Sequence, residues 1–409
     1  IAACLWRNFL KWLNWILEMP KLASRLTHFT ESIIRDMTRV ADQYGAINLA
    51  QGYPNFDPPE ALVTAAVEAL RAGHHQYGLT SGTPNFRSAL ARKQSHFMGL
   101  EIDPDRHVTT TCGSTEAMLA AFMTVLNPGD KVIIFSPVYE NYIPDSILSG
   151  ASPIYIPLHP PNFSLDMDEL RAGFEKGARA LILCNPNNPT GKVFTPEELK
   201  AIAGLAVAYD AYIITDEVYE HIVYPPHRHT YLASLPGMFE RTISCGSLSK
   251  TYAVTGWRLG YAIACPDVTE GIRKVHDFLT IGAPTPLQEA AVTALGFPHS
   301  YYRQVQDEYS QRRELFLSYL DRAGLRYTRP QGAYYVMVDI SAFGFEDDTA
   351  FCYWMTKEIG VAAVPGGSFY PLNPAGKPVK TGMMRLHFAK SNDLLTTAGE
   401  RLLRLKDVI

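Results

Sequence analysis

The sequence is poor in cysteine and has no excess of positive charge. Its six cysteines are spread over 409 residues, with neither a CxxC pair nor the spacing of a metal site, which argues against a disulfide framework or a zinc module. Cys184, Cys245 and Cys265 lie in or beside apolar runs, and we expect them to be reduced core residues of a cytoplasmic protein. The net charge of −4 offers no basic surface for a nucleic-acid backbone, so we expect no nucleic-acid partner.

The sequence also lacks an apolar run of the length that crosses a membrane. Residues 1–18 come nearest, being rich in Trp, Leu and Phe, but polar side chains interrupt them at helical spacing. We expect an N-terminal extension here, either an amphipathic helix on a membrane surface, a helix packed on the body, or an upstream extension of the reading frame. The last reading rests on Met19, which precedes Pro20 and Lys21 in the manner of a natural start. We assign no function to this segment and expect no membrane partner.

The pattern of apolar runs predicts an α/β fold with two domains. From about residue 107, short apolar runs alternate with helical patterns, which is typical of a mostly parallel sheet flanked by helices on both faces. After about residue 297, a long helix and antiparallel-type strands indicate a smaller α+β domain. We therefore expect a large domain over residues 49–296 and a small domain over residues 19–48 and 297–409. A helix over residues 22–44 is expected to join the small domain.

Polar and aromatic residues follow the predicted strands at the points where these strands end. They are Ser114, Tyr139, Asn188, Asp216 and Lys250. In an open parallel sheet the carboxyl ends of the strands share one edge, and ligands bind there. The sequence therefore predicts a site at this edge. Ser114 alone is a weak signal, because a serine at that position also serves as a helix cap.

Lys250 lies in the stretch SLSKTYAVTGWRLG, among small and hydroxylated residues at the end of a predicted strand. Burial among neutral groups removes the charge from a lysine amine and makes the amine a nucleophile for a carbonyl. Arg258 follows eight residues later. The stretch is not a nucleotide-binding P-loop, because Ser249 stands where that motif requires glycine.

Several motifs resemble, in order and spacing, those of the class I (fold type I) pyridoxal-phosphate-dependent aminotransferases. The resemblance runs from about residue 22 to the end and is greatest to the branch with kynurenine and methionine aminotransferases. The matching strings are QGYPNFDPP, HQYG, NPNNPTG, TDEVYEHI, SLSKTYAVTGWRLG and MRLHFAK. The resemblance implies the fold-type-I architecture, an enzyme and pyridoxal 5′-phosphate as its cofactor.

The resemblance also implies the two principal catalytic roles. Lys250 would form a Schiff base with the cofactor aldehyde and act as the general acid and base. Asp216 would pair with the protonated pyridine nitrogen, because a carboxylate there keeps the ring cationic and able to accept electrons. We expect the neighbouring Glu217 to be a surface group.

The remaining cofactor contacts are carried over from the family motif by motif. Asn188 and Tyr219 would bind the phenolic oxygen, and Tyr139 would stack on the ring. The phosphate would be bound by Ser114, Thr115, Ser247 and Arg258, with Gly113 permitting the turn beneath it and Tyr77 reaching in from a neighbouring subunit. The last contact implies a homodimer with shared active sites.

The resemblance assigns the substrate contacts to the small domain and its hinge. Arg385 would bind the substrate α-carboxylate through a bidentate fork that lysine cannot provide. Gly52, Tyr53 and Asn188 would line the same end of the pocket, and substrate binding would close the domains. The stretch LTIGAPTP, expected near the substrate side chain, contains no arginine. Neutral donors, aromatic or thioether, are therefore favoured over aspartate.

The predicted function is transfer of the amino group of a methionine- or kynurenine-like L-amino acid to a 2-oxo acid. Cysteine-S-conjugate β-lyase activity uses the same residues and stays an alternative. A non-catalytic, cofactor-binding regulator would need a helix-turn-helix domain, for which the segment before residue 22 is too small. We expect no metal site, because His74, His75, His227 and His229 fall in loops and are expected to be solvated.

Overall fold

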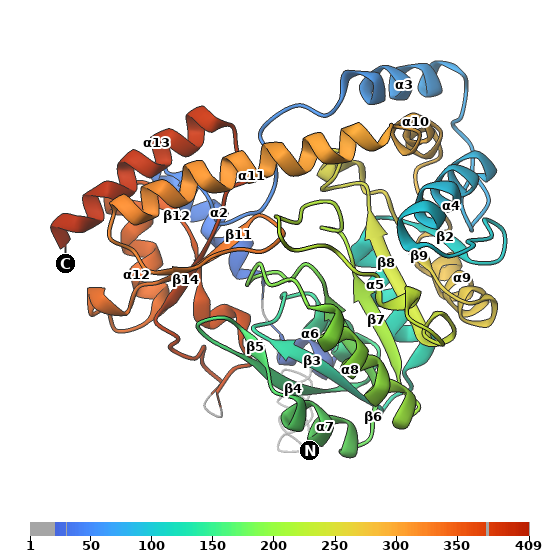
Figure 1. The fold of residues 1–409 in the computed structure, drawn as a ribbon, viewed down its shortest axis with the longest axis horizontal. Coiled ribbons are helices and arrows are strands. Elements are labelled where there is room, and N and C mark those ends of the chain that lie inside the picture. Colours follow the sequence, from blue (N-terminus) through green and yellow to red (C-terminus); the bar gives the residue numbers. More distant parts are fainter. Residues whose placement is uncertain (1–20, 30, 374–375, 409) are drawn as a thin grey trace, which may run out of the picture. The chain divides into compact units, whose positions relative to one another are not determined.

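The computed structural model describes residues 21–29, 31–373 and 376–408 (Figure 1). The predicted N-terminal extension, residues 1–18, lies outside the described residues. Ahead of Ser32, the described residues belong to a compact unit of their own and contain an exposed 3₁₀ helix, η1 (Ser24–His28). The second unit runs from Ser32 onward and contains all the elements below.

The predicted helix over residues 22–44 is wrong in its first half. The helix α2 spans Ile33–Tyr44, because the Ser32 side chain accepts a hydrogen bond from the backbone N–H of Arg35 and caps the first turn. Gly45 ends the helix as expected, with a left-handed φ of 58° that glycine adopts without strain. The N-cap serine therefore sets the start of α2.

A large sheet of eight strands carries the carboxyl edge on which the site was predicted. The order is β2-β9-β8-β7-β6-β3-β4-β5. The strands from β8 to β4 run parallel, whereas β9 is antiparallel to both of its neighbours and β5 is antiparallel to β4. The bounds are β2 Val108–Thr111, β3 Lys131–Ser136, β4 Ser152–His159, β5 Ser164–Leu165, β6 Ala178–Cys184, β7 Tyr212–Asp216, β8 Thr242–Ser247 and β9 Gly260–Ile263.

Helices cover both faces of this sheet (Figure 1). On one face lie α5 (Ser114–Val125), α6 (Tyr142–Leu148) and α9 (Pro266–Thr280), with Phe122 and Ile134 in the shared core. On the other lie α7 (Met167–Glu175) and α8 (Pro196–Ala208), which pack over Phe194 and Ile213. A further core lies under α3 (Glu60–Arg71), α4 (Pro84–Met98) and α10 (Thr285–Leu295). The predicted α/β class is thus the observed one.

A second, antiparallel sheet follows in the C-terminal part, in the order β10-β11-β14-β13. Its strands are β10 Tyr327–Thr328, β11 Tyr335–Asp339, β13 Val364–Pro365 and β14 Met383–His387, and β1 (Ile47–Asn48) pairs in parallel with β12 (Val361–Ala362). The helices here are α11 (His299–Arg322), α12 (Asp348–Trp354), the π-helix η6 (Met355–Ile359) and α13 (Asn392–Leu402); α11 and α13 pack side by side (Figure 1). Short 3₁₀ helices connect the elements: η2 Leu232–Ser234, η3 Phe239–Arg241, η4 Thr255–Trp257, η5 Ser341–Phe343, η7 Gly366–Phe369 and η8 Leu403–Val408.

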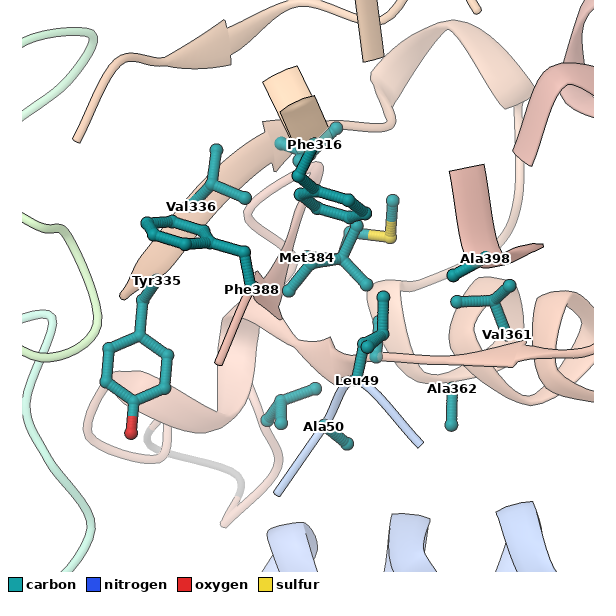
Figure 2. Close-up of a cluster of buried hydrophobic side chains, with 14 of the residues drawn as sticks. Leu49, Ala50, Phe316, Tyr335, Val336, Val361, Ala362, Met384, Phe388 and Ala398 are labelled. Atoms are coloured by element: carbon teal, nitrogen blue, oxygen red, sulfur yellow. The ribbon is translucent and has the colours of Figure 1, made fainter. Parts of the chain in front are cut away.

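The two faces of the second sheet differ in a way that matters for the site. Figure 2 shows the ring of Tyr335 turned away from Phe316 and Met384, which belong to the apolar core beneath α11. Successive strand residues alternate between faces, and Met337 of β11 pairs with Arg385 of β14. Arg385 therefore shares a face with Tyr335. The division of the chain into a large and a small domain stays a prediction.

In the part of the chain that the structure describes, no helix has the length and apolar character that crossing a bilayer requires. Over the same residues, no group of three or more His, Cys, Asp or Glu side chains is arranged to hold a metal ion. Cys184 and Cys245 are buried free cysteines, whereas Cys265 is partly exposed and is not the core residue that we expected.

Candidate active site

A cavity of about 470 Å³ opens at the carboxyl ends of the strands of the large sheet. Most of the predicted site residues line it, although they come from distant parts of the chain. They are Gly52, Tyr53, Ser114, Thr115, Tyr139, Asn188, Asp216, Tyr219, Lys250, Arg258 and Arg385. The cavity thus joins the edge of the large sheet with one strand of the second sheet.

Lys250 follows β8 and points into the cavity. Its Nζ donates a hydrogen bond to the carbonyl oxygen of Gly52 at 3.3 Å. Burial lowers the pKa of Lys250 from 10.5 to about 8, with Arg258 and Arg385 lowering it further and Asp216 opposing the shift. A substantial fraction of this amine is therefore neutral, and nucleophilic, near physiological pH.

Asp216 is the last residue of β7 and is 5% exposed. Burial raises the pKa of its carboxyl, while a hydrogen bond from the Tyr142 hydroxyl to Oδ2 at 2.7 Å and the charge of Lys250 counteract that shift. The carboxylate is thus held in place with room for a cationic partner in the cavity.

Two expectations about neighbouring polar residues are wrong. Glu217 is 3% exposed and not a surface group, and burial together with Glu220 raises the pKa of its carboxyl to about 8. The side chain of His229 is 5% exposed and not solvated, and burial lowers the pKa of its ring to about 4. The two side chains lie 3.9 Å apart in a polar cluster with Glu220, and neither lines the cavity.

The start of α5 forms a close-packed cradle with Arg258. Gly113, with φ of +81°, is the N-cap, and no side chain caps the helix, so the alternative that Ser114 is only a helix cap is not observed. A Cβ on Gly113 would lie 2.3 Å from Nη2 of Arg258, and one on Gly260 would lie 2.4 Å from the backbone nitrogen of Ser114. Arg258 itself adopts a left-handed φ of +52°, a strained conformation for a side-chain-bearing residue.

Two predicted phosphate ligands do not line the cavity. Ser247 is buried behind Ser249, and its hydroxyl contacts the hydroxyl of Ser249 at 2.7 Å and the carbonyl of Leu259 at 3.0 Å. Tyr77 is 85% exposed and lies beside a different cavity, with Gly282 and Pro284. Neither side chain therefore lines the cavity of its own subunit.

Arg385 is fully buried and is not a solvent-facing strand residue. Its Nη1 donates to Oδ1 of Asn188 at 2.8 Å and its Nη2 to the carbonyl of Ala50 at 2.6 Å. The guanidinium lies between the rings of Tyr335, at 4.3 Å, and Phe369, at 4.8 Å. Its Nε is buried without a partner in the described structure, so the group retains a donor for an anion.

Gly52 sits where only glycine fits. A Cβ there would lie 2.2 Å from the hydroxyl oxygen of Tyr335. That hydroxyl is 3.0 Å from the hydroxyl of Tyr219, and burial raises the pKa of Tyr219 well above its ordinary value. The Tyr219 hydroxyl is thus a protonated donor at the cavity wall.

The sequence reasoning missed several cavity residues. Tyr142 and Asp145 lie in α6, in the same SPVYENYIPD string as Tyr139. Their spacing of three residues could have predicted that they share one face of a helix next to Tyr139. Ser249 was visible in the lysine motif, but Tyr335 and Arg35 come from segments whose sequence carries no motif that we used. Burial raises the pKa of Asp145 to about 8, with Asp216 adding to the shift.

A mixed α/β fold with a desolvated lysine, a buried aspartate and a buried arginine around one cavity defines an enzyme that handles amino and carboxylate groups. The sequence pattern of the family described as aminotransferase class I and II matches residues 44–402, and the chain belongs to that family. The protein is therefore an aminotransferase, as the motifs indicated.

Individual relatives cover nearly the whole chain. A methionine aminotransferase of Escherichia coli (strain K12) is 35% identical over 382 residues, which cover 93% of this chain and 98% of the relative. The human kynurenine–oxoglutarate transaminase 1 is 35% identical over 402 residues, covering 91% and 95%. The solved structure of N-succinyldiaminopimelate aminotransferase from Mycobacterium tuberculosis superposes with a TM-score of 0.90 at 35% identity, covering 94% of this chain and 100% of that one.

Proposed function

We propose that this aminotransferase uses pyridoxal 5′-phosphate to move the amino group of a neutral L-amino acid, aromatic or thioether, to a 2-oxo acid. The observation that carries the proposal is the placement of Lys250, Asp216 and Arg385 on one cavity. An amine nucleophile, a carboxylate for a ring cation and a carboxylate receptor are the three groups that such a reaction requires.

The residues present fit the cofactor. The tight contact between Gly113, Gly260 and Arg258 forms a cradle that a single Cβ would fill, at a helix start with no side-chain cap. Backbone N–H groups, the helix dipole and the guanidinium favour a phosphate there. Asp216 would accept the ring N–H, Tyr139 would lie on the ring face, and the phenolic oxygen would accept from Tyr219 and Asn188.

When bound, pyridoxal phosphate supplies an aldehyde that takes up the amino group and a ring that withdraws electrons from the substrate α-carbon. Lys250 Nζ, a fraction of which is neutral because of its lowered pKa, would accept the proton from that carbon and pass it to the cofactor carbon that carries the aldehyde. Arg385 holds the α-carboxylate so that the carbon lies within reach of Nζ, and Gly52 lets its backbone approach the substrate.

The neutral side chains of the outer cavity support the choice of donor. Ile34, Tyr53 and Tyr335 offer aliphatic and aromatic surface for a thioether or aryl group. The names of the methionine and kynurenine relatives agree with such donors.

The test is a half-reaction screen of the purified, cofactor-loaded protein against the twenty amino acids. Conversion of the cofactor is followed by its absorbance. Methionine and the aromatic amino acids should react fastest and aspartate slowly. If no amino acid alters the spectrum, the proposed function is wrong.

We further propose a homodimer in which Tyr77 completes the phosphate site of the other subunit. The 85% exposure of Tyr77, and of Phe278 at 92%, suits residues that a second copy covers. A Tyr77→Phe variant should bind the cofactor more weakly while staying dimeric in analytical ultracentrifugation; a monomeric wild-type protein would contradict this proposal. We also propose that the protein is cytoplasmic, as the cysteine content led us to expect.

A further inference from the structure

Residues 51–53, which we call the rim segment, line the cavity between two attachments to the end of the second sheet. Ahead of the segment, the backbone N–H of His387, the last residue of β14, donates to the carbonyl of Leu49 at 3.1 Å. Beyond it, the backbone N–H of Ser391 donates to Oδ1 of Asn55 at 2.6 Å. The rim segment therefore lies against the residues that follow β14.

Between these two attachments, Lys390 contacts Tyr53 in two ways. Its Nζ donates a hydrogen bond to the carbonyl oxygen of Tyr53 at 3.0 Å and lies 3.7 Å from the centroid of the Tyr53 ring. A cation so close to an aromatic ring is attracted by the ring electrons. One amine thus holds both the backbone and the ring of a residue that lines the cavity.

The burial of Lys390 is costly for the fold. The residue is 3% exposed, and burial lowers the pKa of its amine to about 8. Within the described part of the chain, no carboxylate forms an ion pair with Nζ or opposes that shift. Stability alone would favour an apolar side chain here, because a buried charge without a counter-ion is not compensated for its lost hydration. The contacts with Tyr53 are what the amine provides and an apolar side chain cannot.

The residue before Tyr53 is fixed from another side. The carbonyl of Gly52 accepts a hydrogen bond from the Tyr334 hydroxyl at 3.0 Å, and a Cβ on Gly52 would lie 2.2 Å from the hydroxyl oxygen of Tyr335. Gly52 is therefore packed against β11 with no space to spare. With Gly52 held by β11 and Tyr53 held by Lys390, the rim segment is shaped before a substrate arrives.

We propose that Lys390 is a positioning residue, which fixes the Tyr53 ring at the rim of the cavity and thereby sets the preference for amino acids with aromatic or thioether side chains. This inference rests on the proposed function and deepens it by naming the residue that makes this surface rigid. A ring held in advance takes up an aryl or thioether group without losing conformational freedom on binding. Alanine, with a single methyl group, offers the ring little surface.

The first experiment compares Lys390→Met and Lys390→Arg with a matched control, Lys131→Met. Lys131 also donates to a backbone carbonyl, that of Lys176 at 2.8 Å, but it is exposed at the amino end of β3 and does not line the cavity. Half-reactions of each loaded protein give the maximal rate and the half-saturating concentration for phenylalanine, methionine and alanine.

Lys390→Met should raise the half-saturating concentrations of phenylalanine and methionine about three- to tenfold relative to that of alanine, because the ordered ring is lost. The maximal rates should be unchanged, since Lys250 is untouched. Lys390→Arg keeps a cation that stacks on an aromatic ring, so it should retain most of the preference. Lys131→Met should retain all of it.

Two further measurements separate positioning from a purely structural role. Urea denaturation should show that Lys390→Met is at least as stable as the wild type, because an apolar side chain of similar length replaces a buried charge. In a double-mutant cycle with Tyr53→Ala, Lys390→Met should have no further effect on the donor preference once the ring is gone. A lysine that merely stabilised the fold would give neither result.

A binding measurement that needs no turnover accompanies the kinetics. The ligands are 3-phenylpropionate and propionate, which carry no amino group, and isothermal titration calorimetry gives each Kd. The wild type should bind 3-phenylpropionate more tightly than propionate, and Lys390→Met should remove most of that preference. Lys131→Met should keep it.

Four results would overturn the inference. They are an unchanged donor preference in Lys390→Met, an equal loss for all three donors, a Lys390→Met protein that does not fold, or a cycle in which Lys390→Met still acts without the Tyr53 ring. In each case, transamination by the wild type leaves the proposed function standing. A wild type that reacts with no amino acid, yet binds 3-phenylpropionate in a Lys390-dependent way, would reject the proposed function and keep the positioning role.

Discussion

Lys93 and Lys250 are both withdrawn from water, and they differ in what surrounds them. Lys93 of α4 is buried behind β7, where its Nζ lies 2.8 Å from Oε1 of Glu220 and 3.1 Å from the side-chain oxygen of Gln94. Lys250 lines the cavity, and within the described part of the chain its Nζ donates a single long hydrogen bond, to the backbone carbonyl of Gly52 at 3.3 Å. Burial lowers the pKa of both amines.

The carboxylates beside these lysines show the same contrast. Glu220 accepts hydrogen bonds from Lys93, Gln94 and Tyr231, and although burial alone would raise the pKa of its carboxyl, Lys93 and His221 hold it well below the ordinary value. Asp216 accepts one short hydrogen bond, from the Tyr142 hydroxyl, and a longer one from the Val218 N–H at 3.4 Å, and it lines the cavity. A buried carboxylate surrounded by donors is structural, whereas one that faces a cavity keeps acceptor capacity for a ligand.

The largest expected effect is on Lys250. Lys250→Ala should lower kcat by about 10²–10⁴-fold, the usual contribution of a general acid and base, and should abolish the visible absorbance of the lysine-held cofactor. Stopped-flow and steady-state assays measure the first, and a spectrum measures the second. Retained turnover would show that Lys250 is not catalytic, so that it would not differ in function from Lys93.

Lys93 should show the opposite phenotype. Lys93→Met leaves the charge of Glu220 buried and unpaired, so it should lower the free energy of unfolding by about 3–5 kcal/mol. Urea denaturation measures the loss, and the double variant Lys93→Met, Glu220→Leu should recover part of it. Activity per cofactor-loaded site should be unchanged; a large drop in kcat per loaded site would mean that the two clusters are not separate.

Arg385 lies between these extremes, because it is buried yet retains an open donor. Arg385→Gln should raise the KM for amino acids by about 10–100-fold, the cost of losing hydrogen bonds to a charged group, with a smaller effect on kcat. Arg385→Lys, which keeps the charge without the fork, should also bind poorly. An unchanged KM in both variants would show that the α-carboxylate binds elsewhere.

The smallest expected effect is a pH dependence. The neutral amine is the nucleophile, and Lys250 has a pKa of about 8 in place of 10.5, so capture of pyridoxal phosphate by the cofactor-free protein should accelerate up to about pH 8 and then level off. Stopped-flow absorbance measures the rate. A rate that keeps rising beyond pH 10 would indicate an ordinary, solvated lysine.

The place of the site at the carboxyl edge was readable from the sequence, because Asn188, Asp216 and Lys250 each end or follow an apolar run that forms a parallel strand. The start of α2 was not, since Ser32 is one of several hydroxylated residues and only its hydrogen bond to the Arg35 N–H singles it out as the cap. The strand β4 was not identified either, because Pro153 and Pro157 interrupt its apolar pattern. These prolines are tolerated because β4 lies near the edge of the sheet, next to the short edge strand β5.

The polar cluster was the hardest part to predict. Glu217 adjoins Asp216 in sequence, but neighbouring residues at a strand end face opposite ways, and the partner that makes burial tolerable for Glu220 is 127 residues distant. Tyr77 and Ser247 carry the family motifs, yet the first faces outward and the second is bonded to Ser249. A motif specifies residue types and leaves their contacts to the rest of the fold.

The most direct test of the account is to locate the cofactor covalently. The protein is loaded with pyridoxal phosphate, reduced with borohydride and digested, and the modified peptide is identified by mass spectrometry. The account predicts a single modified side chain, Lys250, with none at Lys93. Modification of another lysine, or a protein that takes up no cofactor, would contradict it.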